Sequence, residues 1–522
     1  MNRRLTAAAA SRYGLVATTL CLATAAGGAE PTAPPPNIVL FYADDLGYGD
    51  LGCYNPRSKI PTPVLDRLAA EGLRFTDGHS SSSICSPSRY ALLTGCYHWR
   101  KFHHIVDAFG PSHFAPERLT LPEMLRQRGY QTACIGKWHL GWDWEALKRA
   151  DARPERILEQ GRERLVWGHE DFDWSLPVQN GPCDHGFDDY FGDDVINFPP
   201  YAWIENKRLI EPPDGPLKLA GNPQEGAWEA RPGPARSTWN FSENLPTLTR
   251  KAVDYVARRQ HQNRPFFLYF PLPSPHAPIV PAREFDGRSQ AGPYGDYAVQ
   301  TDWACGQVLA ALEAAGHAER TLVIFTADNG PERYAYRREV QFGHWSAEPL
   351  RGLKRDLYEG GHRVPFLLRW PGRLAPATQC DALVSQIDVM ATLAAVVGYE
   401  LPSDAAEDSV NLLPLLQGSG RGRTTLVHNT YSEKYALRED SWVLIDAEDG
   451  YHSPRDADWD RLRGYGDDGS PAGQLFDLAT DIGERRNVID QHPQRAARMR
   501  ETLAALRAHR GSTPPLSASQ TP

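Results

Sequence analysis

The feature that most restricts the fold of this 522-residue chain is a set of short apolar runs separated by polar stretches. The runs lie at 37–42, 131–135, 265–270, 321–326 and 364–368. A continuous apolar run predicts a strand that is buried on both faces, as in parallel sheets. Segments 66–72 and 120–129 predict intervening helices that each end at a glycine. The chain is therefore predicted to be an α/β protein built on a buried parallel sheet.

The length of the chain and a change of pattern predict more than one domain. Single hydrophobic cores stop growing at about 250–300 residues, and the pattern of this chain changes near residue 400. Beyond that point, 436–445 and 474–478 predict short strands, and 493–509 predicts an amphipathic helix. The predicted parts are a large α/β domain over 30–400, a smaller α+β domain over 401–511 and a disordered tail over 512–522.

Composition places the chain among globular proteins and argues against a nucleic-acid partner. Apolar residues make up 41% and charged residues 23% of the chain, which is an ordinary balance. The net charge of −9 leaves no basic excess for binding a phosphate backbone. The 44 glycines and 43 prolines predict long structured loops, which often carry function. Segment 145–250, rich in Trp, Pro and Asp, is interpreted as insertion loops that shape access to a site.

The N-terminus has the pattern of a secretory signal peptide over 1–29. Arginines at 3, 4 and 12 accompany a short apolar stretch at 14–26, and small residues near 25 and 29 suit cleavage. The alternative, a transmembrane anchor, needs about 20 apolar residues. A lipid anchor at Cys21 is poorly supported, because Thr19 and Leu20 do not match a small-residue attachment box. We expect an exported protein, periplasmic or secreted, without stable membrane insertion.

Cysteine usage gives a weaker constraint. Eight cysteines occur, and removal of Cys21 with the signal peptide leaves seven, an odd number for an oxidising compartment. The sequence has no CxxC pair, which argues against a cysteine-based structural zinc site. Which of the remaining cysteines form disulfides is left open.

Polar side chains follow three of the predicted strands. Asp44-Asp45, Lys137-x-His139 and Asp328-Asn329 all come shortly after an apolar run. Ligands of open α/β sheets bind outside the carboxyl ends of the strands, so we expect these residues to share one site. Three Asp and one Asn supply oxygen ligands only, which suits Ca²⁺ or Mg²⁺ better than zinc or copper.

The sharpest local signal lies at 83–95. Ser86 fits an N-cap, Pro87 the first helical position and Gly95 the end of a helix. Cys85 would then precede a helix N-terminus, where free N–H groups favour an anion, with Arg89 about one turn further on. The alternative for Cys85 is an ordinary disulfide partner.

These residues carry a resemblance to a known family. Cys85-Ser86-Pro87-Ser88-Arg89 matches the Cys-x-Pro-x-Arg signature of the sulfatases. Further segments resemble sulfatase motifs in the family's order, up to about residue 490: 37–50, 93–95, 136–141, 275–278, 326–330, 351–354 and 359–361. Segment 285–296 is most similar to the branch of arylsulfatase A and N-acetylgalactosamine-6-sulfatase.

The resemblance implies a fold, a modification and a metal. The fold would be alkaline-phosphatase-like, a large mixed sheet flanked by helices with a smaller C-terminal α+β domain. Cys85 would be converted to formylglycine by a formylglycine-generating enzyme. Ca²⁺ would be held by oxygens of the modified Cys85 and of Asp44, Asp45, Asp328 and Asn329.

The resemblance also implies a reaction, the hydrolysis of sulfate esters on a sulfated small molecule or glycan. One hydroxyl of the hydrated aldehyde would attack sulfur, and deprotonation of the other would expel sulfate by breaking the carbon–oxygen bond. His139 is the candidate base for that expulsion. The candidates for stabilising charge on the sulfuryl group or for contacting the leaving oxygen are Arg89, Lys137, His276 and Lys354.

Weaker candidates and two rival functions complete the prediction. The loop residues considered for substrate contact are Asn197, Tyr201, His185 and Asp188, with a structural role as the alternative for each. His103, His104 and His344 are interpreted as ordinary loop residues, although His103 is near enough to the Cys85 helix to line the site, and His428 could reach it from the second domain. One rival is a phosphodiesterase or phosphonate monoester hydrolase of the same superfamily. Asn329 favours sulfate, because relatives that act on phosphorus often have Asp-His at this position. The other rival is a non-catalytic sulfoglycan-binding protein, which intact catalytic positions argue against.

Overall fold

The computed structural model describes residues 34–159, 162–218, 225–226, 229–430, 434–452, 454–466 and 469–508. The predicted signal peptide over 1–29 and the predicted tail over 512–522 lie outside the described residues. No helix within the described ranges is long and apolar enough to cross a membrane.

A large mixed sheet organises the described part of the chain. Its strand order is β15-β2-β14-β13-β1-β12-β4-β7-β8-β9. The five central strands run parallel: β13 (Thr321–Ala327), β1 (Asn37–Ala43), β12 (Phe266–Pro271), β4 (Gln131–Ile135) and β7 (Asp189–Gly192). The strands on either side are β14 (Phe366–Arg369), β2 (Leu73–Phe75), β15 (Thr378–Cys380), β8 (Ile204–Glu205) and β9 (Arg208–Leu209). The predicted α/β class with a large mixed sheet is confirmed.

Two details of the predicted sheet are wrong. The run at 364–368 contributes to β14, which is antiparallel to β13 rather than parallel. An apolar run indicates burial on both faces, whereas strand direction depends on the connection. The chain leaves β13 and enters β14 at the same end of the sheet, so these neighbours are antiparallel. Segment 145–250 is also more than insertion loops, because it contains β7, which pairs with β4 inside the sheet.

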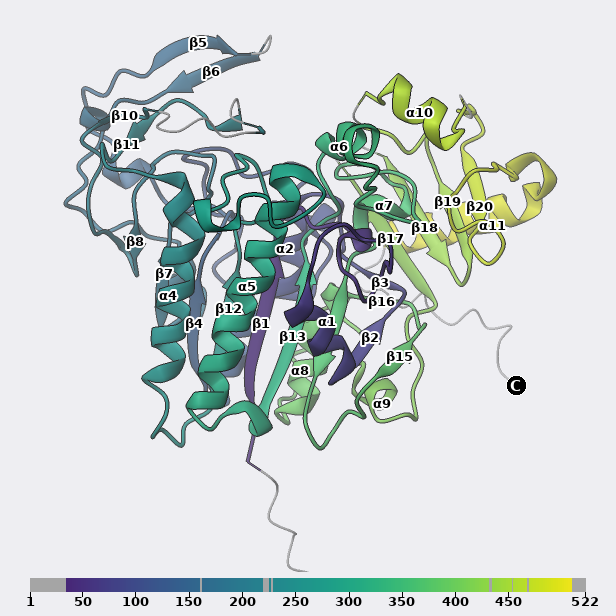
Figure 1. Cartoon of the computed structure of the whole chain (residues 1–522), viewed down its shortest axis with the longest axis horizontal. Helices are drawn as coiled ribbons and strands as arrows, with labels where there is room; N and C mark the ends of the chain where they lie inside the picture. Colours follow the sequence, from purple (N-terminus) through teal and green to yellow (C-terminus); the bar gives the residue numbers. More distant parts are fainter. Residues whose placement is uncertain are drawn as a thin grey trace, which may run out of the picture. The chain divides into compact units, whose positions relative to one another are not determined.

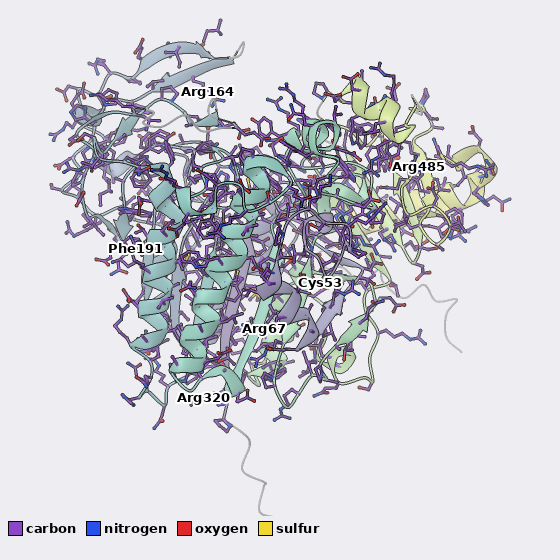
Figure 2. All side chains as sticks on the ribbon, viewed as in Figure 1. Cys53, Arg67, Arg164, Phe191, Arg320 and Arg485 are labelled. Atoms are coloured by element: carbon purple, nitrogen blue, oxygen red, sulfur yellow. The ribbon has the colours of Figure 1, made fainter. Side chains whose placement is uncertain are left out.

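Helices cover both faces of the sheet (Figure 1). Ile38 and Leu40 of β1 belong to the core under α2 (Cys85–Thr94), α3 (Leu121–Gln127) and α8 (Val389–Val396). Val39 and Phe41 belong to the opposite core, under α1 (Pro63–Ala70), α4 (Asn244–Ala257) and α5 (Gly292–Ala314). Alternate residues of a strand point to opposite faces, so one apolar run supplies both cores. Side chains fill the space between the layers (Figure 2).

Local signals fix the ends of the helices. Thr120 and Glu123 form a reciprocal capping box at the start of α3. Gly95 ends α2 with φ of 64°, as predicted. The predicted start of α2 is wrong by two residues, because the helix begins at Cys85 rather than at Pro87 and its N-cap residue is Ile84 rather than Ser86. The Ser86 hydroxyl instead accepts a hydrogen bond from the Val106 N–H at 3.1 Å.

A second, antiparallel sheet lies near the C-terminus. It consists of β17 (Thr425–Asn429), β18 (Tyr435–Glu439), β19 (Trp442–Ile445) and β20 (Gln474–Asp477). The predicted strand segment 436–445 thus forms most of a hairpin, which turns at Asp440 with φ of 51°. Helix α11 (Pro493–Ala508) contacts this sheet and buries Met499, Leu503 and Leu506, as its pattern predicted.

The remaining elements are short. The helices are α6 (Tyr334–Phe342), α7 (Glu359–His362), α9 (Leu413–Leu416) and α10 (Ala457–Arg463). The strands form the pairs β3 (Gly78–His79) with β16 (Val384–Ser385), β5 (Glu155–Glu159) with β6 (Arg162–Val166), and β10 (Gly215–Pro216) with β11 (Pro234–Ala235).

Candidate active site

The predicted acidic residues meet at the carboxyl ends of two adjacent strands. Asp44 and Asp45 follow β1, Asp328 and Asn329 follow β13, and the last residues of these strands are paired in register. The N–H of Asp45 donates to Asp328 Oδ1 at 3.3 Å. Asp45 has a left-handed φ of 62°, a conformation that non-glycine residues adopt mainly where surrounding contacts hold them. The parallel pairing of the two strands therefore builds one acidic site from distant segments.

Three buried cations face these carboxylates. Arg89 reaches from α2 to Asp328 Oδ2, at 3.1 Å from Nε and 2.8 Å from a terminal nitrogen. Lys137, which follows β4, contacts Asp44 Oδ2. Lys354 Nζ lies 2.7 Å from Asp45 Oδ1. Because all six side chains are buried, their charges interact with little screening by water.

Cys85 is the first residue of α2 and lies beside this network. Its side chain is buried, and no disulfide joins the seven cysteines in the described ranges, so the disulfide alternative for Cys85 is wrong. Burial raises the pKa of the Cys85 thiol, Asp328 and Asp44 raise it further, and Lys137 and Lys354 oppose the shift. The Cys85 side chain is therefore close enough to both lysines and both aspartates to interact with their charges.

The oxygen atoms of the site fit a hard cation. Asp44 Oδ1, Asp45 Oδ2 and Asn329 Oδ1 are buried and have no hydrogen-bond partner among the described residues. The Asn329 amide donates from Nδ2 to Asp45 Oδ1 at 2.7 Å and to the Gly330 carbonyl at 2.8 Å, which leaves its oxygen bare. Buried polar atoms without partners are rare, and oxygen donors are the ligands that Ca²⁺ and Mg²⁺ prefer. The donor set therefore matches the predicted metal.

The surroundings of the site shift the pKa values of Asp44 and Asp328 in opposite directions. Burial would raise the pKa of Asp44, but Lys137, His276 and Arg89 together hold it well below its ordinary value. Burial and the charge of Asp44 raise the pKa of Asp328 to about 7, against the effect of Arg89. Neighbouring carboxylates resist simultaneous ionisation unless positive charge compensates them. A divalent ion at the unpartnered oxygens of Asp44, Asp45 and Asn329 would add positive charge and favour the ionised form of Asp328.

Two predicted histidines have defined tautomers. The Nε2–H of His139 donates to the Val106 carbonyl at 3.0 Å, and Nδ1 is buried without a partner in the described structure. The Nδ1–H of His276 donates to the Ala277 carbonyl at 2.5 Å, and Nε2 lies 3.7 Å from Asp45 Oδ2. Burial, then Lys354, lowers the pKa of His276 to about 4, and burial also lowers that of His139. Each neutral ring therefore presents one free lone pair.

Most of the weaker loop candidates have structural contacts. The Tyr201 hydroxyl bonds the carbonyl of Asn197 at 2.9 Å, and Asn197 Nδ2 donates to the Glu229 carbonyl at 3.3 Å. His185 lies 3.3 Å from the Ser112 hydroxyl, and Asp188 accepts from the Thr132 N–H at 3.0 Å. Of this group, only the Asn197 side-chain oxygen is buried without a partner within the described ranges.

The other histidine candidates lie in separate settings. His103 contacts Asn429 at 2.9 Å, and His104 is exposed. His344 contacts Asp50 at 2.8 Å. It therefore supports the segment that follows Asp45, in which Asp50 lies. His428 belongs to a different cluster, with His79 and His362.

The structure adds two residues that the sequence reasoning missed. Asp194 accepts from the His139 N–H at 3.1 Å and so fixes the backbone of that histidine. Glu332 lies 3.8 Å from Lys354 and forms an ion pair with Arg355 at 2.6 Å. Neither is part of a recognisable short motif, although Glu332 follows the Asp328-Asn329-Gly330 turn by two residues.

Comparisons with known proteins agree with this geometry. The sulfatase family matches residues 36–399, and the family described as N-sulphoglucosamine sulphohydrolase, C-terminal, matches residues 353–509. An N-acetylgalactosamine-6-O-sulfatase of Bacteroides thetaiotaomicron is 33% identical, covering 90% of this chain and 93% of the relative. Arylsulfatase A of Homo sapiens is 36% identical, covering 90% of this chain and 86% of the relative.

A solved structure gives the same result. It comes from work on the metabolism of multiple glycosaminoglycans by Bacteroides thetaiotaomicron and shares 29% sequence identity with this chain. The TM-score is 0.75, and the match covers 91% of this chain and 100% of that chain. The family match, the sequence identity and the arrangement of the site residues agree. This chain therefore belongs to the sulfatase family of sulfuric ester hydrolases.

Proposed function

We propose that this sulfatase uses formylglycine at position 85 and Ca²⁺ to hydrolyse a sulfate ester of a glycan. The observation that carries the proposal is a set of three buried oxygens, on Asp44, Asp45 and Asn329, that have no hydrogen-bond partner in the described part of the chain. They lie beside Cys85 and three buried cations. A neutral cysteine does not explain such a concentration of charge, whereas a site that binds an anionic sulfate ester and stabilises the negative charge on its oxygens does.

The modification and the metal supply the parts of the chemistry that the unmodified chain lacks. Hydrated formylglycine provides two hydroxyls on one carbon, and Ca²⁺ provides a Lewis acid held by Asp44, Asp45, Asp328 and Asn329. The chain's own residues bind and orient the substrate. Lys137, Lys354 and Arg89 would hold the sulfuryl oxygens, and this role is supported by their burial, their charge and their contacts with the acidic residues of the site.

Proton transfer is assigned to groups with suitable hydrogen bonds. His139 would accept the proton that is lost when sulfate is expelled, since its Nδ1 carries a lone pair and Nε2–H is committed to the Val106 carbonyl. The pKa of Lys354 is raised, because Asp45 outweighs the effect of burial, so Lys354 keeps its proton and can donate a hydrogen bond to the leaving oxygen. His276 is placed to contact the same group.

The substrate and location are inferred from relatives and from the N-terminus. The bacterial relative is named for N-acetylgalactosamine-6-sulfate, and the solved structure comes from work on glycosaminoglycans. These names support a sulfated amino sugar as substrate. The signal-peptide pattern over 1–29 supports export. We also retain the division into a catalytic domain over 30–400 and a C-terminal subdomain over 401–511.

A peptide mass spectrum of the protein from its native host tests the nucleophile. The expected result is a peptide covering position 85 with the mass of formylglycine in place of cysteine. Cys85→Ala should abolish sulfate release with little loss of stability, because no disulfide is broken. Cys380→Ala, which removes a half-buried free thiol far along the chain in β15, is the matched control and should keep full turnover.

The substrate class is tested by parallel assays. N-acetylgalactosamine-6-sulfate, an aryl sulfate and a phosphate diester would be compared by kcat/KM. We expect the sulfated sugar to be turned over fastest. Faster turnover of the phosphate diester would instead favour the phosphodiesterase alternative, and binding without turnover by formylglycine-containing protein would favour a sulfoglycan-binding protein.

A further inference from the structure

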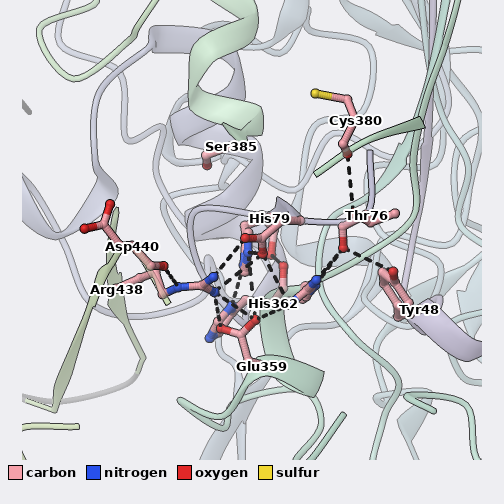
Figure 3. A network of polar contacts seen from close by, with 12 residues as sticks. Tyr48, Thr76, His79, Glu359, His362, Cys380, Ser385, Arg438 and Asp440 are labelled. Carbon is pink, nitrogen blue, oxygen red and sulfur yellow. Dashed lines mark hydrogen bonds and ion pairs between the residues drawn. The ribbon is translucent and has the colours of Figure 1, made fainter. Parts of the chain in front are cut away.

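Three histidines converge outside the catalytic site. His79 lies in β3, His362 ends α7 and His428 lies in β17, and all three are almost completely buried. Their ligand atoms lie within 4.8 Å of one another. Figure 3 shows His79 and His362 side by side, next to Glu359 and Arg438. The three rings come from segments that are distant in the sequence, so their meeting is a product of the tertiary fold.

Hydrogen bonds set the tautomers of two of these rings. His79 Nε2 lies 2.8 Å from Asp77 Oδ1, and His362 Nε2 lies 3.2 Å from the Leu357 carbonyl. Both partners are acceptors, so each Nε2 carries the proton of a neutral ring and each Nδ1 carries a lone pair. The two Nδ1 atoms face each other at 3.1 Å. Two lone pairs at that separation repel unless a proton or a metal ion lies between them.

The third ring distinguishes a metal ion from a shared proton. The His428 ring stacks on that of His362, with centroids 3.4 Å apart and planes at 13°. Neither of its nitrogens has a hydrogen-bond partner among the described residues. A proton shared by His79 and His362 would leave His428 unsatisfied. A metal ion can take a nitrogen from each ring once His428 turns out of its stacked position, because the lone pair of an imidazole nitrogen lies in the plane of its ring.

The charged neighbours of the cluster balance one another. Asp77 and Glu359 lie 2.8 Å and 3.9 Å from His79 Nε2. Arg438 pairs with Asp77 at 2.9 Å, and Arg363 pairs with Glu359 at 3.0 Å. Because the carboxylates are occupied, the cluster offers neutral imidazole nitrogens rather than oxygens. Imidazole suits Zn²⁺ and similar ions, whereas Ca²⁺ requires oxygen ligands.

We propose that His79, His362 and His428 form a second metal site, which binds one Zn²⁺ ion and is separate from the catalytic cation site. Zn–N bonds are about 2.0–2.1 Å long, so two nitrogens 3.1 Å apart subtend about 100° at the ion, close to a tetrahedral angle. The bond from His79 to Asp77 is the outer contact that ligating histidines commonly make. Three rings leave the fourth position for water or a small anion.

The site would be structural. β3 leads into the segment before Cys85, α7 follows the loop that carries Lys354, and β17 belongs to the C-terminal sheet. An ion bound by all three histidines would fix the C-terminal sheet to the segment before Cys85 and to the loop that carries Lys354. The proposal does not depend on the proposed function, because it concerns metal content rather than turnover.

Metal analysis of the full-length protein tests the proposal. The protein would be equilibrated with Zn²⁺ in the presence of Ca²⁺, desalted and measured for both metals by mass spectrometry. We expect about one Zn²⁺ per chain in the wild type, and loss of that ion in His79→Ala and His428→Ala. His169→Ala removes a histidine whose side chain is 40% exposed and is the matched control, which should retain zinc.

Two further measurements keep the test independent of folding defects. Asp77→Asn leaves the three ligands in place and should weaken zinc binding about 10–100-fold. Co²⁺ in place of Zn²⁺ should give the visible absorption of a four-coordinate nitrogen site in the wild type. A wild-type protein that retains no zinc, or that retains it equally in His79→Ala and His428→Ala, would overturn the proposal.

Discussion

Tyr294 supports the loop that carries Asp44 and Asp45, and its hydroxyl can be removed without altering the packing of the ring. It lies in α5, buried, with its oxygen 2.6 Å from Asp50 Oδ2 and 2.8 Å from the Asp45 carbonyl. Asp50 also accepts from the Gly47 N–H and from His344, each at 2.8 Å. Asp50 therefore links α5 to the turn that follows Asp44 and Asp45.

Tyr294→Phe should lower the free energy of unfolding by about 2 kcal/mol. A hydrogen bond to a charged group contributes about 1.5–3 kcal/mol, and the phenylalanine ring leaves no cavity. We expect the lower half of that range, because Asp50 keeps two of its three donors. The loop would also hold Asp45 less firmly in its left-handed conformation, so calcium affinity should fall together with stability.

Equilibrium urea unfolding of the calcium-free protein, followed by tryptophan fluorescence, measures this effect. Tyr399→Phe is the matched control, since its hydroxyl bonds the exposed amide of Gln127 at 2.8 Å and should change stability by no more than about 0.5 kcal/mol. If Tyr294→Phe proved as stable as Tyr399→Phe, the reasoning that Asp50 anchors the loop through Tyr294 would be refuted.

Three further substitutions test other parts of the argument. His139→Gln should reduce kcat about 10²–10⁴-fold with little change in KM, and a variant that keeps wild-type turnover would exclude His139 as the base. Arg423→Met removes the buried partner of Asp388, which it contacts at 3.0 Å, and should destabilise the protein by about 3–5 kcal/mol in urea unfolding. Thr120→Ala breaks the capping box of α3 and should lower stability by about 1 kcal/mol, whereas an unchanged urea midpoint would show that the cap contributes nothing.

Local signals predicted the central strands and the position of the acidic pairs that follow them. The runs at 37–42 and 321–326 become β1 and β13, because a strand buried on both faces must be apolar along its whole length. The polar residues after these strands were predicted to share a site, and the parallel pairing of β1 and β13 brings them together. The same signals failed at the start of α2, where the Ser86 hydroxyl bonds Val106 instead of capping the helix.

Local sequence thus determined which segments become strands, where the acidic pairs stand relative to them and which cysteine lies near the N-terminus of a helix. The direction of β14, the contact of Lys354 with Asp45 and the anchoring of Asp50 by Tyr294 and His344 were decided only by the tertiary structure. The meeting of His79, His362 and His428 belongs to the same class. Each depends on how the fold brings distant segments together. Hydrophobic periodicity indicates the type and burial of a single element and not its neighbours in space.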